Sequence, residues 1–241
     1  MKSLIACFAF TVLAATGSPA LASPLALVYN GDGACPDDCA KSAALIAEKI
    51  GFRVRYINAE TWDSSVFEDA SLWIHPGGVA SLAVDEFTSA QKQSIRNFIA
   101  RGGGYVGFCA GAFFAADSFY SNGPSHRKFE TLEILPVEAE VRPSKTQASM
   151  LYVEWGGVRR HLYFEGGAVF RSPIPAGVEV IGTYDDGGAA TVRGLYGKGR
   201  VYITGPHPEA PQDWRTYFQL TDKDGLDEDL VKEMYSWAAG R

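Results

Sequence analysis

The stretch that decides the fold is GYVGFCAGA, residues 104–112. Tyr105 to Cys109 has the apolar character of a buried strand, and small residues follow at once. Gly107 and Gly111 stand two positions either side of Cys109, where side chains would collide if a strand turned sharply into a helix. The pattern predicts a strand–turn–helix elbow that carries a nucleophile at its corner.

Cys109 has two interpretations at such an elbow. If a helix begins at the sulfur, the partial positive charge of its N-terminus favours the thiolate, which is the nucleophilic form of cysteine. The alternative is a small buried core residue, because free cysteine is among the most buried residue types. The spacing of the elbow favours the nucleophile.

Strand and helix signals alternate around the elbow in the first half of the sequence. Apolar or alternating runs predict strands at residues 25–29, 53–57, 72–75 and 105–109. Helical spacing predicts helices at residues 40–50 and 88–100, with Thr88 or Ser89 as the cap of the second. This order is typical of βαβ units in a mainly parallel sheet.

The second half changes to short β-like runs separated by glycine-rich turns. These runs lie at residues 132–141, 150–155, 161–164, 178–183, 190–196 and 201–204. They predict hairpins and antiparallel strands added to the parallel sheet. An amphipathic pattern at residues 226–239 predicts a closing helix.

The first 22 residues have the pattern of a cleaved secretory signal peptide. Lys2 gives a positive start, residues 4–12 are mostly apolar, and residues 20–22 (Ala-Leu-Ala) form a small-x-small site before Ser23. The apolar run falls short of the roughly 20 residues of a bilayer span, which leaves an uncleaved anchor as the alternative. We expect one domain at residues 23–241, periplasmic or secreted, without stable membrane insertion.

The charge balance of this expected mature chain argues against nucleic acid as a partner. The leader contains one base and no acid, so 22 − 1 = 21 basic residues face 28 acidic ones, a net charge of −7. These charges are spread along the chain rather than gathered in basic blocks.

Three cysteines follow the leader, and their odd number leaves at least one thiol without a partner inside the chain. Cys35 and Cys39 are four residues apart at an expected helix start, which brings their Cα atoms to about 6 Å, within reach of a disulfide. The alternative is a redox gate in which one of the pair reaches Cys109. Two further cysteines or paired histidines are missing nearby, so neither a metal site nor a cofactor is predicted.

Several stretches resemble the class I glutamine amidotransferase-like superfamily, and most closely the branch named after the N-terminal domain of fungal biotin-protein ligases. They are residues 29–31 (YNG), 75–78 (HPGG), 102–112 (the elbow), 163–167 (YFEGG), 197–201 (GKGRV) and 205–209 (GPHPE). The resemblance covers most of the expected mature chain. It implies a flavodoxin-like α/β fold with a central, mainly parallel sheet, flanking helices and added antiparallel strands.

The resemblance also implies a Cys-His-Glu triad. In that superfamily a His-x-Glu pair late in the chain completes the triad, and His207 and Glu209 match this pair. The histidine would take the proton of Cys109 and later protonate a leaving amine, while the carboxylate would hold the imidazole in one tautomer and orientation. The alternative for His207 is a loop or capping histidine.

The loop at residues 76–78 resembles the superfamily's oxyanion-hole loop. On this resemblance the donors are the backbone amides of Gly77 or Gly78 together with that of Ala110; an ordinary strand-to-helix turn is the alternative. Four further side chains are weaker candidates for the pocket mouth, with strand residues beside turns as the alternative: Glu154, Trp155, Tyr163 and Glu165. His75 is either another polar wall of the pocket or structural.

The sequence departs from the superfamily where glutamine is recognised. Glutamine-using members have a His-Gln pair shortly after the elbow, whereas residues 110–114 here are AGAFF. No Gly/Arg-rich biotinyl-adenylate loop is present in the sequence, so biotin ligation by this chain itself is not predicted. We expect an exported cysteine-dependent hydrolase of an amide or related acyl bond in a small-molecule or peptide-like substrate. The alternative is a non-catalytic module that binds a small molecule or a protein.

Overall fold

The structure is a computed structural model that describes residues 23–63, 65–119, 128–142 and 146–241. The expected signal peptide, residues 1–22, lies outside the described residues. Within the described part of the chain, no helix is long and apolar enough to cross a bilayer.

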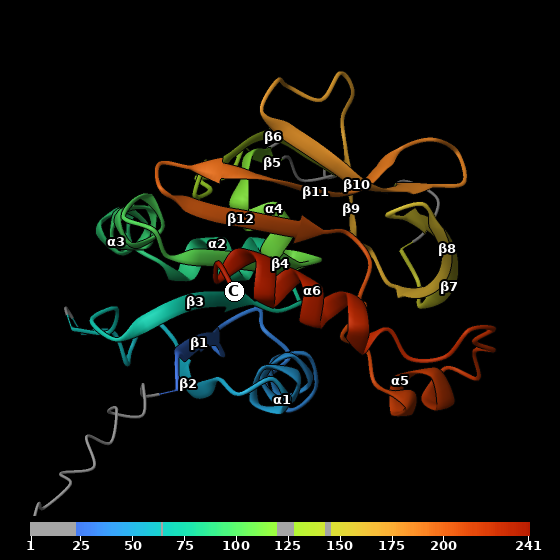
Figure 1. Cartoon of the computed structure of the whole chain (residues 1–241), viewed down its shortest axis with the longest axis horizontal. Helices are drawn as coiled ribbons and strands as arrows, with labels where there is room; N and C mark the ends of the chain where they lie inside the picture. Colours follow the sequence, from blue (N-terminus) through green and yellow to red (C-terminus); the bar gives the residue numbers. More distant parts are fainter. Residues whose placement is uncertain (1–22, 64, 120–127, 143–145) are drawn as a thin grey trace, which may run out of the picture.

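Within the described residues the structure has a 12-stranded sheet, and a parallel set of strands forms one side of it (Figure 1). In spatial order these are β2 (Arg53–Ile57), β1 (Leu25–Tyr29), β3 (Ala70–His75), β4 (Gly104–Phe108) and β12 (Gly199–Thr204). Every residue of β1 and β4 is buried. Burial on both faces explains why these strands read as continuous apolar runs rather than as alternating ones.

Antiparallel strands extend the sheet beyond β12. They follow in the order β11 (Ala189–Tyr196), β10 (Val178–Tyr184), β7 (Ser149–Trp155) and β8 (Val158–Phe164). A side branch joins β11 through β9 (Ala168–Phe170), β6 (Leu135–Val141) and β5 (Ala116–Phe119).

Helices cover both faces of the central sheet. One hydrophobic core lies beneath α1 (Lys41–Lys49) and α6 (Glu228–Ala238), which lie together in Figure 1. The opposite core lies beneath α2 (Ala80–Glu86), α3 (Ser89–Ala100) and α4 (Ala110–Ala115). A short π-helix, η1 (Pro36–Ala40), precedes α1, and α5 (Gln212–Tyr217) lies at one end of the molecule.

The predicted fold class is confirmed: a central parallel sheet, flanking helices and added antiparallel strands. Of the two candidate caps of α3, Thr88 is the cap in the structure, because Thr88 and Gln91 form a reciprocal capping box. The structure differs from the sequence prediction at β12. This strand was grouped with the antiparallel additions, but it pairs parallel with β4 in the middle of the sheet.

The predicted elbow is confirmed as well. β4 ends at Phe108, α4 begins at Ala110, and Cys109 between them has φ 44° and ψ −100°. A β-carbon on Gly107 would lie 2.5 Å from the carbonyl oxygen of Gly111, and one on Gly111 would lie 2.2 Å from that of His75. Both glycines are therefore required by close approach of backbone to backbone.

This packing predicts that Gly111→Ala destabilises the protein by about 3 kcal/mol, because the added methyl meets a backbone oxygen that belongs to a central strand. Gly156→Ala is a suitable control, since the site has open space and a positive φ of 58°. It should cost only about 1 kcal/mol. Denaturant unfolding of both variants measures the difference, and equal losses would contradict the proposed backbone contact.

Candidate active site

Three neighbouring parallel strands deliver the candidate residues to one edge of the sheet. The loop after β3 holds Gly77 and Gly78, β4 runs into Cys109, and β12 runs into His207 and Glu209. The amide of Cys109 donates to the carbonyl oxygen of Thr204, the last residue of β12, at 2.9 Å. The carboxyl edge of a parallel sheet is where ligands of open α/β folds bind.

The structure brings Cys109, His207 and Glu209 together. Nδ1 of His207 and Oε1 of Glu209 are 2.9 Å apart, and the same imidazole is in hydrogen-bond contact with the thiol of Cys109. All three side chains are buried. This is the relative arrangement that a nucleophile, its acid–base partner and an orienting carboxylate require.

The electrostatics of this group favour a protonated imidazole. Burial lowers the pKa of His207, but the charges of Glu209 and Cys109 and the hydrogen bonds to both outweigh burial, so that the net pKa is well above its ordinary value. An imidazolium in contact with a cysteine stabilises the thiolate.

A second contact favours the thiol instead. The sulfur of Cys109 also lies 3.6 Å from the backbone carbonyl oxygen of Glu165, to which the S–H group donates. A thiol is a weak donor, whereas hydrogen bonds that involve an ionised partner are roughly twice as strong as neutral ones. The two contacts therefore act on the sulfur in opposite directions.

The imidazole of His207 is held in place on several sides. A β-carbon on Gly77 would lie 2.3 Å from its Cε1 atom, so the absence of a side chain at residue 77 makes room for the ring. The rings of Tyr163 and Trp214 pack edge-on against it at centroid distances of 5.8 and 5.6 Å. The backbone amide of His207 donates to the carbonyl oxygen of Tyr163 at 2.9 Å.

The candidate oxyanion donors lie beside this group. Ala110 is the first residue of α4, where a backbone amide has no acceptor within its own helix. Gly78 forms a bridge with Ala34, and its φ of 139° together with the 1.8 Å approach of a β-carbon to the oxygen of Gly33 requires glycine there. Their function as donors to an oxyanion stays a prediction.

A cavity of about 670 Å³ opens above the sulfur of Cys109. Tyr163 and Glu165, the weaker candidates from the sequence, are in its wall. No sequence motif predicted the rest of that wall, which includes Asp38, Asp213, Trp214, Tyr217 and Phe218. The available signal was the group of three aromatic residues within residues 214–218, a short and otherwise polar segment.

Three other candidates lie away from the cavity. Trp155 is buried and its indole approaches Glu233, and Glu154 lies beside it in the same strand, β7. His75 is completely buried and stacks on Tyr29 at 4.4 Å, and burial lowers its pKa to about 3. His75 is therefore a neutral core residue and not a polar wall of the pocket.

Cys35 and Cys39 are free thiols in the structure, with their side chains in hydrogen-bond contact at the cavity wall. The bond from Cys39 lowers the pKa of Cys35, while that bond and burial raise the pKa of Cys39. The sulfur of Cys39 lies 3.5 Å from the β-carbon position of Gly77. The disulfide stays a prediction, and the pair is placed to form one.

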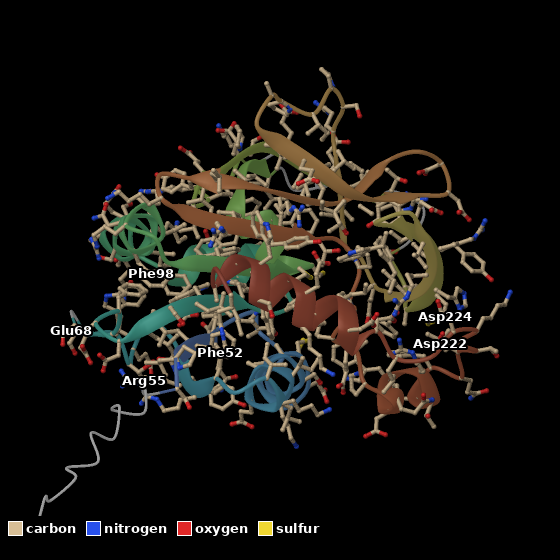
Figure 2. The ribbon with its side chains drawn as sticks, viewed as in Figure 1. Phe52, Arg55, Glu68, Phe98, Asp222 and Asp224 are labelled. Atoms are coloured by element: carbon tan, nitrogen blue, oxygen red, sulfur yellow. The ribbon has the colours of Figure 1, made fainter. Side chains whose placement is uncertain are left out.

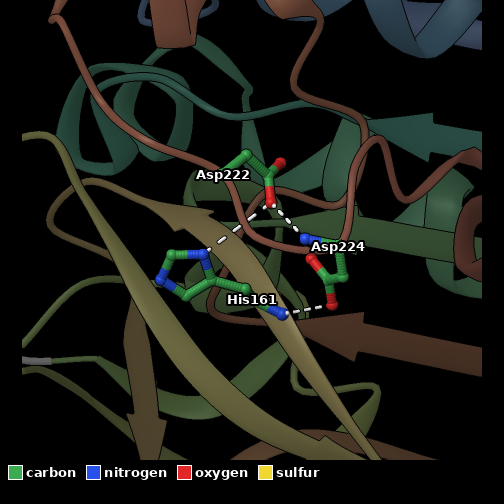
Figure 3. Close-up of side chains that lie close together, drawn as sticks. All are labelled: His161, Asp222 and Asp224. Carbon is green, nitrogen blue, oxygen red and sulfur yellow. Dashed lines mark hydrogen bonds and ion pairs between the residues drawn. The ribbon is translucent and has the colours of Figure 1, made fainter.

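A separate cluster of metal-ligating residue types consists of His161 in β8 and Asp222 and Asp224 in the loop after α5 (Figure 3). The donor atoms already have partners. Asp224 accepts from the backbone amide of His161 at 2.9 Å, and Nδ1 of His161 accepts from that of Lys223 at 3.2 Å. Asp222 accepts from Nε of Arg215 at 2.6 Å. We assign the cluster a structural role that ties this loop to β8.

Arg215 extends the same network into α5. Its buried guanidinium binds Asp222, Asp227 and the carbonyl oxygen of Ala210. Because the acids balance its charge, Arg215 anchors α5 without adding a free cation beside the cavity. Asp222 and Asp224 mark this end of the molecule in Figure 2, opposite Glu68.

Comparison with known proteins agrees with the fold. Residues 25–128 match the family described as biotin-protein ligase, N terminal. The chain is 25% identical over 207 residues to a biotin–protein ligase from Schizosaccharomyces pombe, a match that covers 76% of this chain and 33% of the ligase. This chain therefore spans about a third of the length of that relative.

Solved structures share the fold. A crystal structure of a glutamine amidotransferase has a TM-score of 0.60 at 20% identity, covering 89% of this chain and 100% of that one. A putative ThuA-like protein from Bacteroides uniformis has a TM-score of 0.58 at 15% identity, covering 92% and 95%. Residues 25–128 therefore resemble the N-terminal family of biotin-protein ligases, and the fold is shared with a glutamine amidotransferase.

The contact between Gly77 and the imidazole predicts that Gly77→Ala displaces His207 and slows alkylation of Cys109 at neutral pH by roughly tenfold or more. The rate of iodoacetamide labelling measures this effect. Thermal unfolding serves as the control for a fold that stays intact. Unchanged labelling in a folded variant would show that the ring does not need this space.

The neighbouring thiols predict that oxidised glutathione converts Cys35 and Cys39 to a disulfide. The Cys35 thiolate attacks the glutathione disulfide and releases one glutathione, and Cys39 then displaces the second. Peptide mass spectrometry should find this pair joined and Cys109 still open to alkylation. Reversible loss of Cys109 alkylation, with a Cys39–Cys109 peptide, would establish the redox gate instead.

Proposed function

We propose that this chain is an exported cysteine-dependent hydrolase of an amide or related acyl bond. In this proposal Cys109 is the nucleophile, His207 the acid–base and Glu209 the residue that orients the imidazole. The observation that supports it is the contact of these three side chains at the base of a cavity. The leader pattern at residues 1–22 supports export.

The reaction follows from the positions of these groups. The thiolate of Cys109 attacks the carbonyl carbon, and the amides of Ala110 and of Gly77 or Gly78 stabilise the developing oxyanion. The imidazolium of His207 gives its proton to the leaving amine, which leaves an acyl-enzyme. A water molecule then attacks the thioester while His207 accepts its proton, and breakage of the carbon–sulfur bond releases the acid.

Ligation of biotin is not part of this proposal. The match to the ligase covers a third of that protein, and the departure at residues 110–114 separates this chain from glutamine-using relatives. In the structure Phe113 and Phe114 face the hydrophobic core, so they offer no polar group for glutamine.

One observation favours the binding module as a second candidate. The S–H group of Cys109 donates to the carbonyl oxygen of Glu165, an arrangement that suits an unreactive thiol. In that case the cavity binds a ligand without turnover. The hydrolase and the binding module therefore differ in whether the sulfur of Cys109 is ionised.

The raised pKa of His207 predicts the pH dependence of Cys109 labelling. Because the imidazolium persists through neutral pH, its effect on the attacking sulfur persists too, and the labelling rate should change little between about pH 5 and 8. In His207→Ala the rate should fall about tenfold for each pH unit below the ordinary thiol pKa of about 8.5. Kinetics with iodoacetamide measure both profiles.

Cys109→Ser identifies the labelled residue, and circular dichroism checks that each variant is folded. Slow labelling with the same steep pH profile in the wild type and in His207→Ala would reject the hydrolase and favour the binding module.

A further inference from the structure

The cavity above Cys109 has an unbalanced negative charge. Three exposed carboxylates line it from three different segments: Asp38 in η1, Glu165 after β8 and Asp213 in α5. Among the described residues of the lining, none is lysine or arginine. None of the three carboxylates has an ion-pair partner within the described part of the chain.

The charged groups behind the cavity wall do not make the net charge of the cavity positive. A thiolate at Cys109, an imidazolium at His207 and a carboxylate at Glu209 together add one further negative charge. The nearby guanidinium of Arg215 is balanced by Asp222 and Asp227. A concave site with carboxylates at its mouth concentrates cations and repels anions.

Aromatic side chains complete the wall on the side of α5. Tyr217 is 80% exposed and Phe218 is 43% exposed, and Trp214 lies deeper, against the ring of His207. Exposed aromatic faces beside carboxylates attract ammonium groups, because the face of the ring carries partial negative charge. They also provide apolar contact for the carbon chain that carries the ammonium group.

We propose that the cavity selects amides that carry an alkylammonium group, such as acylated amines or short peptides with a lysine-like side chain. The ammonium group lies among Asp38, Glu165 and Asp213, its chain packs on Trp214 and Phe218, and the scissile carbonyl reaches Cys109. A volume of about 670 Å³ suits a small molecule or a few residues of peptide. The amide bond rests on the proposed hydrolase, whereas the selection of cations rests on the wall alone.

Charged thiol reagents test this selection without a known substrate. Cys109 is treated with a methanethiosulfonate that carries a trimethylammonium group and, separately, with one that carries a sulfonate. In each reaction the thiolate attacks the sulfenyl sulfur, a mixed disulfide forms and methanesulfinate leaves. The Cys109 peptide is quantified by mass spectrometry, and each rate is divided by that of free N-acetylcysteine.

The normalised rate should favour the cation by roughly tenfold or more, and the preference should shrink as salt is raised. Asp213→Asn and Glu165→Gln should each reduce it by roughly two- to fivefold, the range measured for exposed charges. Glu68→Gln removes the same charge at the opposite end of the molecule (Figure 2) and should leave it unchanged. A normalised ratio near one, or an equal effect of Glu68→Gln, would overturn the proposal.

Binding to Cys109→Ser separates this inference from the hydrolase. Benzylamine, benzyl alcohol and benzoate are titrated into the variant and followed by calorimetry. Benzylamine should bind most tightly and benzoate most weakly, although the variant lacks the thiol of Cys109. Selective binding of benzylamine without turnover by the wild type would reject the hydrolase alone. Turnover of amides irrespective of their charge, with equal binding of the three probes, would reject the cation site alone.

Discussion

The close approach of backbone at the elbow is the constraint on which this structure depends. Residues 107 and 111 have no side chains, so the carbonyl of His75 and the first turn of α4 come within contact of each other. The turn forces Cys109 to a positive φ, a conformation that costs about 1–3 kcal/mol in a residue other than glycine. The buried strands on both sides hold it there.

That constraint also orders the site around the sulfur. The end of β4 fixes the position of Cys109, and the adjacent strand β12 brings His207 beside it at a fixed register. The imidazole then fills the space that Gly77 leaves open, and Glu209 orients the ring. The outer wall of the cavity depends on a different interaction. The buried guanidinium of Arg215 binds Asp222 and Asp227 and so connects α5 to the loop that follows it.

Local sequence predicted the features that depend on local geometry. Glycine spacing predicted the elbow, periodicity located the central strands and helices, and Thr88 was one of two expected caps. The position of β12 in the sheet was not predicted. A short apolar strand after a turn has the same sequence pattern whether its second neighbouring strand is parallel or antiparallel to it. Its complete burial at residues 201–204, visible only after folding, fits the centre of the sheet.

The candidate site likewise has parts that the local sequence predicted and parts that it did not. His207 and Glu209 could be named because they stand in one short motif. The wall formed by Asp213 and Trp214 depends on how α5 docks, and the ion pairs of Arg215 that hold α5 form only in the folded chain. His75 shows the converse. A histidine at a strand end looked polar in sequence, yet its neighbours Tyr29 and Phe114 enclose it in the core.

The pairing of β4 with β12 has a consequence for how the protein folds during synthesis. The strands β4 and β12, which lead into Cys109 and His207, are separated by about ninety residues of chain, so all of these residues must be synthesised before the two strands can pair. Until then the fourth strand is an open sheet edge, which invites pairing with other chains. Distant pairings of this kind also slow folding. The thiol of Cys109 and the imidazole of His207 therefore come together only after the intervening residues are available to enclose them.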